Sequence, residues 1–94
     1  MVKRMSKPIS DPRESDGIDE VQERYLILHN DEIHSFDYVI QALVEICEHQ
    51  QEQAEQCALI THFKGQCDVK KGPLPMLRSK KTALSQRGLR VTID

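Results

Sequence analysis

The stretch YLILHNDEIHSFDYVI, residues 25 to 40, contains the signals that decide the fold. Its first five residues form a short, largely apolar run rich in strand formers, and the polar turn residues that follow predict a buried strand over 25–29. Ser35 then suits a helix N-cap. From there apolar residues recur at helical spacing, at Phe36, Val39, Ile40, Leu43 and Cys47. The strand therefore leads into a helix through a short polar loop.

The rest of the chain supplies two more helices and two more strands. A second helix is predicted over 51–64, closed by Gly65, with small residues on one face. Residues 67–69 favour a strand, and GPLP at 72–75 indicates a break and the start of a third helix. Residues 89–93 alternate like a half-buried strand. The order strand–helix–helix–strand–helix–strand predicts an α+β fold of three helices packed on a small sheet.

The first residues differ in composition from the rest. Residues 1–23 hold four Lys/Arg and six Asp/Glu, and Pro8, Pro12 and Gly17 interrupt any periodic pattern. Such a segment buries too little apolar surface to order itself. We therefore expect a disordered tail over 1–23 and one folded domain over 24–94.

Charge and hydropathy restrict the partners. Residues 24–94 hold nine Lys/Arg and nine Asp/Glu, which predicts a balanced surface without the positive field that nucleic acid requires. No stretch is long and apolar enough to span a bilayer, and no signal-peptide core follows the N-terminal basic residues. We expect a soluble, cytoplasmic protein that binds neither nucleic acid nor membrane. Cys47, Cys57 and Cys67 lack zinc-knuckle spacing and are expected to be reduced, buried thiols.

Three side chains offer hydrogen-bond acceptors to a small cation. An Asn30 amide oxygen, an Asp31 carboxylate and a neutral His62 imidazole match the three N–H donors of a primary ammonium. Alternatively, Asn30 and Asp31 only form an Asx turn and His62 points to solvent at a helix end. In the same way, Ala58 and Thr61 would either wall an apolar hole or mark close helix packing.

Enzymatic chemistry has little support. His29, His34 and His62 could pair with Asp31 or Glu32, but no nucleophile motif and no phosphate loop is present. The histidines also lack the i, i+4 spacing of a zinc protease. We expect no catalytic residue, no metal and no cofactor, and a small metal-dependent hydrolase is the least favoured reading.

YLILHNDEIHSFDYVIQALVEI, followed by ALITHFKGQCDV, resembles the ClpS family of bacterial Clp protease adaptors, which recognise N-degrons. The resemblance covers about 24–94. It implies three helices against a three-stranded antiparallel sheet, similar to the C-terminal domain of the large-subunit ribosomal stalk protein. It also implies an adaptor that binds proteins beginning with Leu, Phe, Tyr or Trp. Such an adaptor hands them to a ClpA- or ClpC-type ATPase for degradation by ClpP, with the tail engaging the unfoldase. We expect a monomer.

The resemblance also assigns a site. It implies that Asn30, Asp31 and His62 bind the substrate's α-amino group and first peptide unit. The implied apolar pocket consists of Phe36, Val39, Ala58, Thr61 and Leu89. The chain departs from the family, which commonly has Met at the positions of Phe36 and Ala58, an apolar residue at Thr61 and Asp at Glu32. These departures leave a second reading, a ClpS-fold interaction module with altered or lost N-degron specificity.

Overall fold

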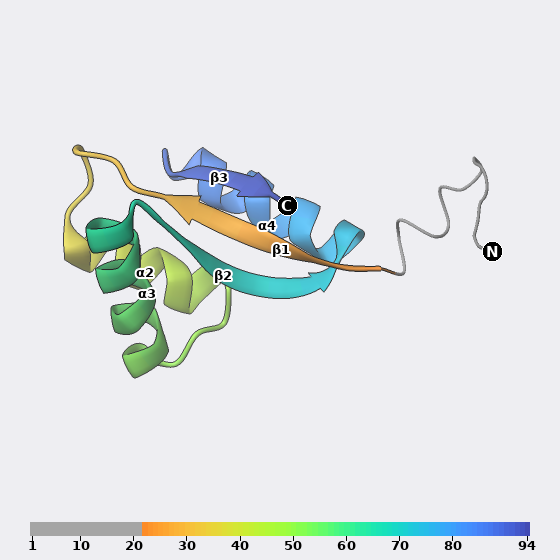
Figure 1. Cartoon of the computed structure of the whole chain (residues 1–94), viewed down its shortest axis with the longest axis horizontal. Coiled ribbons are helices and arrows are strands. Elements are labelled where there is room, and N and C mark those ends of the chain that lie inside the picture. The colour runs from red at the N-terminus through yellow and green to blue at the C-terminus, as the bar shows by residue number, and fades with distance from the viewer. Residues whose placement is uncertain (1–21) are drawn as a thin grey trace.

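The computed structural model describes residues 22–94 as a three-stranded antiparallel sheet with three helices. The elements follow the order β1 (Glu23–His29), α2 (Phe36–Ile46), α3 (Gln51–Lys64), β2 (Gln66–Pro73), α4 (Leu74–Gln86) and β3 (Arg90–Ile93). The strand order is β2-β1-β3, so the first strand lies in the middle of the sheet (Figure 1). The predicted α+β class and antiparallel sheet are confirmed. Most of the expected tail, residues 1–21, lies outside the described residues.

The helices cover one face of the sheet because alternate strand residues are apolar on that side. Leu26 and Leu28 of β1 are almost fully buried, and Leu28 pairs with Cys67 of β2 and Val91 of β3. These side chains share one core with Leu43, Leu77 and Leu84 of the helices. The middle strand thus anchors the core just before the polar loop begins.

The predicted ends of the first two helices are confirmed. The Ser35 hydroxyl accepts a hydrogen bond from the Tyr38 N–H at 3.2 Å, so Ser35 is the N-cap of α2. Gly65 ends α3 in the left-handed region at a φ of 93°. This left-handed cap turns the chain directly into β2.

The second strand is longer than the three residues predicted. It runs to Pro73, and its last residues Gly72 and Pro73 pair with the start of β1. Gly and Pro mark a break in most strands, but β2 is an edge strand, where a missing N–H can face away from the ladder. The expected helix start follows immediately, with Pro75 in the first turn of α4.

Lysines from other elements fix the C-terminal end of α2. Lys70 Nζ donates to the Cys47 carbonyl at 3.0 Å, and Lys80 Nζ donates to the Ile46 carbonyl at 2.9 Å. Both cations meet carbonyl oxygens at the negative end of the helix dipole. This end of α2 is therefore tied to β2 and α4.

No helix within residues 22–94 is long and apolar enough to cross a membrane.

Candidate functional site

The loop between β1 and α2 is anchored at its first residue. The Asn30 N–H donates to the Gly65 carbonyl at 2.9 Å, and Arg90 donates to the Asn30 carbonyl at 3.2 Å. These bonds attach the loop to the end of α3 on one side and to β3 on the other. The Asn30 backbone is thereby held between two elements that are distant in sequence.

Asp31 organises the remainder of the loop. Its Oδ1 accepts hydrogen bonds from the backbone N–H groups of Ile33 and His34, both at 2.9 Å, and its Oδ2 contacts His34 Nδ1 at 3.0 Å. Partial burial acts to raise the pKa of Asp31. The hydrogen bonds from His34 and Ile33 outweigh it, so the pKa lies below its usual value. Asp31 is therefore a carboxylate at neutral pH.

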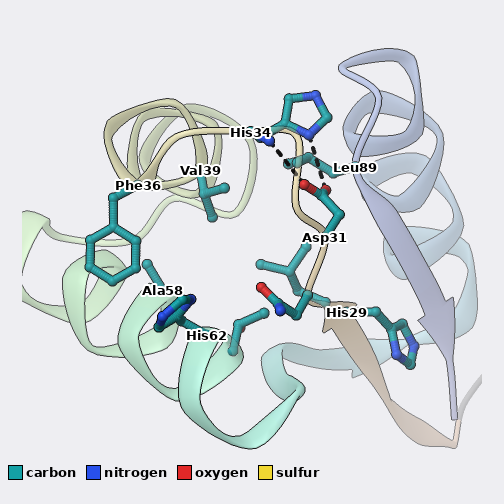
Figure 2. Close-up of a pocket in the computed structure, with 11 residues that line it drawn as sticks. His29, Asp31, His34, Phe36, Val39, Ala58, His62 and Leu89 are labelled. Atoms are coloured by element: carbon teal, nitrogen blue, oxygen red, sulfur yellow. Dashed lines mark hydrogen bonds and ion pairs between the residues drawn. The ribbon is translucent and has the colours of Figure 1, made fainter.

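The end of β1, the loop, α2, α3 and the residue before β3 surround one pocket. All eight residues predicted for the site line it, together with three that were not predicted (Figure 2). The lining consists of Leu28, His29, Asn30, Asp31, His34, Phe36, Val39, Ala58, Thr61, His62 and Leu89. Figure 2 shows Phe36 and His62 on one side of the pocket and Asp31 with His34 on the other.

The polar part of the pocket combines a charged acceptor with two neutral groups. Within residues 22–94, the side chains of Asn30 and His62 make no hydrogen bond to protein atoms, so both remain available to a ligand. Asp31 forms the Asx turn of the simpler interpretation and also lines the pocket. The two readings of this loop are therefore compatible.

The apolar part is small and has an aromatic rim. Phe36 is 41% exposed and meets the His62 ring edge-on, with the ring centroids 6.0 Å apart. The Thr61 hydroxyl donates to the Cys57 carbonyl one turn back at 2.7 Å, so its donor is satisfied inside α3. Thr61 thus lines the pocket without leaving an unpaired donor in the wall.

The three further lining residues are Leu28 and two histidines, which the sequence analysis considered only for acid–base or metal chemistry. His29 Nε2 bonds to the Thr92 hydroxyl at 2.8 Å, across the β1–β3 pair. His34 contacts Asp31, three residues earlier, which is one of the pairings that the sequence analysis considered. Although His29, Asp31, His34 and His62 all surround the pocket, no three His, Cys, Asp or Glu residues in the described part could hold a metal ion.

Comparison with known proteins gives one family and a structural likeness. The model of the ATP-dependent Clp protease adaptor protein ClpS matches residues 19–92. The search of curated proteins finds no match. Among solved structures, Agrobacterium tumefaciens ClpS2 bound to L-phenylalaninamide is similar in fold, with a TM-score of 0.70 at 18% sequence identity. The similarity covers 78% of this chain and 95% of that chain. Because the family match spans most of the sequence, the chain belongs to the ClpS family of Clp protease adaptor proteins.

Proposed function

We propose that this protein binds the free N-terminus of N-degron substrates with a bulky hydrophobic first residue and delivers them to a ClpA- or ClpC-type AAA+ unfoldase for degradation by ClpP. One observation carries the proposal. A single pocket joins ammonium acceptors, Asn30, Asp31 and His62, to an apolar wall that includes Val39 and Leu89. A free amino-terminal residue presents the complementary pair of groups, an ammonium and a side chain on the same carbon atom.

The ligand of the similar structure supports this assignment. L-Phenylalaninamide, which is bound to Agrobacterium tumefaciens ClpS2, carries a free α-amino group next to a benzyl side chain. In this chain, the ammonium would donate hydrogen bonds to the side-chain acceptors of Asn30, Asp31 and His62. The side chain of the substrate's first residue would enter between α2 and α3, where Val39 and Ala58 line the pocket. Recognition of this kind requires no chemical step, which agrees with a family of adaptors.

Fluorescent peptides that differ only in their first residue test the proposal. A peptide beginning with Leu should bind, and its N-acetylated form should bind at least about tenfold more weakly because it has lost the ammonium. Asp31→Asn keeps an oxygen for the loop N–H groups but removes the charge. Loss of one partner in a buried charged pair commonly costs about 2 to 5 kcal/mol, so this variant should also bind at least about tenfold more weakly.

A matched control is available on α2. Asp37 is an exposed acidic residue in the first helical turn that does not line the pocket, so Asp37→Asn should bind like the wild type. Equal affinity for free and acetylated peptides would refute N-terminus recognition. If no bulky first residue binds at all, the alternative of a ClpS-fold interaction module with lost specificity is correct. The aromatic rim at Phe36 is the observation that favours this second candidate.

A further inference from the structure

His34 lies against Asp31 at the edge of the pocket. Its Nδ1 is 3.0 Å from Asp31 Oδ2, and the two side chains are only 19% and 14% exposed. The imidazole also stacks on the Tyr38 ring, with centroids 4.8 Å apart and planes inclined by 19°. One edge of the ring therefore holds a carboxylate while one face is covered by α2.

The same ring reaches the turn before β3. A Cβ added to Gly88 would lie 3.1 Å from His34 Nε2, and this turn precedes Leu89 of the pocket wall. The Tyr38 hydroxyl donates to the Arg87 carbonyl in the same turn at 2.7 Å. His34 and Tyr38 thus fill the space between the Asp31 loop and the segment that carries Leu89. The position of His34 is consequently set from two sides.

The acceptor capacity of Asp31 shows what this arrangement leaves for a ligand. A carboxylate has about four lone-pair positions. Ile33 N–H and His34 N–H use two positions on Oδ1, and His34 Nδ1 uses one on Oδ2. About one position therefore remains, on the oxygen that already faces the imidazole. Any ammonium bound by Asp31 must share that oxygen with His34.

We propose that His34 is a positioning residue for the substrate's N-terminus, whose neutral ring orients the Asp31 carboxylate and whose protonated ring competes with the substrate ammonium for it. This inference rests on the proposed function. A neutral ring with a proton on Nδ1 donates one hydrogen bond and adds no charge. An imidazolium in the same place neutralises the carboxylate and repels the ligand's own cation. Affinity for a free N-terminus should therefore fall when His34 is protonated.

The charged groups around His34 identify what else titrates there. Asp31 faces its edge and Tyr38 its face, and beyond them the Arg87 guanidinium contacts the Glu45 carboxylate at 2.6 Å. Asp31 stays ionised where histidines titrate, because hydrogen bonds lower its pKa despite partial burial. Across the pocket, His62 is the other histidine that a bound ammonium would meet. The experiment must therefore separate His34 from His62.

Peptide affinity measured between about pH 7.5 and pH 5.5 separates them. His34→Asn places an amide N–H near the position of Nδ1 but does not titrate, whereas His34→Ala removes the donor. Near pH 7.5, His34→Asn should bind within about threefold of the wild type and His34→Ala at least about tenfold more weakly. In a His62→Gln background, acidification should weaken binding when His34 is present and have little effect when it is Asn.

A measurement on the unmodified protein complements the variants. At about pH 6.5, adding a free-amine peptide should move the His34 ring resonances toward their neutral position, because ligand and proton exclude each other. An acetylated peptide should not. The inference is overturned if His34→Ala binds the peptide like the wild type. It is also overturned if, in the His62→Gln background, the His34→Asn variant still loses peptide affinity when the pH is lowered. If acetylation has no effect on wild-type affinity, the proposed function fails together with it.

Discussion

Phe36 forms the rim of a small pocket. The pocket has a volume of about 60 Å³, whereas an apolar cavity known to hold benzene measures about 150 Å³. Ala58 leaves room in the wall, but the Phe36 ring takes up space at the entrance near His62. A branched aliphatic first residue should therefore fit more readily than an aromatic one, which requires Phe36 to swing outward.

The corresponding prediction concerns first-residue preference. The wild type should bind a Leu peptide more tightly than an otherwise identical Trp peptide. Phe36→Ala should raise the ratio of Trp to Leu affinity by roughly tenfold, since small changes in pocket volume have effects of this order. Phe63→Ala is the control. Phe63 also meets the His62 ring edge-on but is 77% exposed and does not line the pocket, so its removal should leave the ratio unchanged.

An equal shift in both variants would show that the His62 environment, rather than pocket volume, determines the preference. A Trp preference already present in the wild type would mean that the rim opens at little cost. In either case affinities for both peptides in all three proteins are sufficient to decide.

Helix ends and strand cores could be predicted from the sequence because they depend on local chemistry. Ser35 and Gly65 act at their own positions as caps. By contrast, the full length of β2 depends on β1, whose first residues supply the partners for Gly72 and Pro73. The residues alone gave the order of elements, while the antiparallel pairing came from the family resemblance.

The site shows the same division. Asn30, Asp31 and His62 were selected for their acceptors, and the structure brings them to one pocket. The sequence suggested that His34 could pair with Asp31, and its stacking on Tyr38 is a local i, i+4 contact. Its contact with the turn at Gly88 could not be predicted, because that contact depends on tertiary packing. The assignment of Asn30, Asp31 and His62 to ligand binding remains a prediction.

The three cysteines come from three elements that meet in the core. Cys47 ends α2, Cys57 lies in α3 and Cys67 lies in β2, and all three are free and buried. Burial raises the pKa of Cys47 to about 11 and that of Cys67 to about 12. Both thiols are therefore protonated at neutral pH and are poor nucleophiles as long as these elements stay docked.

These pKa values predict alkaline destabilisation. In the unfolded chain a thiol ionises near about pH 8.5, whereas the folded state holds the proton to about pH 11 or above. Above pH 8.5 the unfolded state binds fewer protons, so the free energy of unfolding should be constant below this pH and decrease as pH rises toward 11. Urea unfolding at a series of pH values measures this free energy of unfolding as a function of pH.

The control for alkaline unfolding is Cys67→Ala. The variant should be less stable at neutral pH because truncation leaves a cavity beside α3, but its stability should fall less steeply above pH 8.5. The two proteins differ in no ionisable group other than Cys67, so the difference between their curves reports on this thiol. If the free energy of unfolding falls equally steeply above about pH 8.5 in the variant and the wild type, the Cys67 thiol does not cause the alkaline destabilisation.

The equal numbers of charges in residues 24–94 conceal their separation along the chain. Seven of the nine Asp/Glu precede Lys64, whereas eight of the nine Lys/Arg are Lys64 or follow it. The acidic group thus belongs mainly to α2, α3 and their loops, and the basic group to β2, α4 and the turns beside them. This separation along the chain is not visible in the total count of charges. Assays with partner proteins need a fixed ionic strength, because screening acts over about 8 Å at physiological salt.

The N-terminal segment can be tested apart from the pocket, because deletion of residues 1–20 leaves in place every core and pocket-lining residue found within 22–94. We expect the truncated protein to keep its Tm and its affinity for a Leu peptide, since the charged, Pro- and Gly-interrupted composition of residues 1–20 predicts little burial of apolar surface. Delivery should fail, because the tail is the segment proposed to engage the unfoldase. The measurement is degradation of an N-degron reporter by ClpP with ClpA or ClpC, comparing full-length and truncated adaptor. A variant in which a Gly/Ser sequence of equal length replaces residues 1–20 shows whether delivery depends on the length of the tail or on its sequence. Full-rate degradation with the truncated protein would show that the tail has no part in handover, while a matching loss of peptide affinity would show that it supports the pocket.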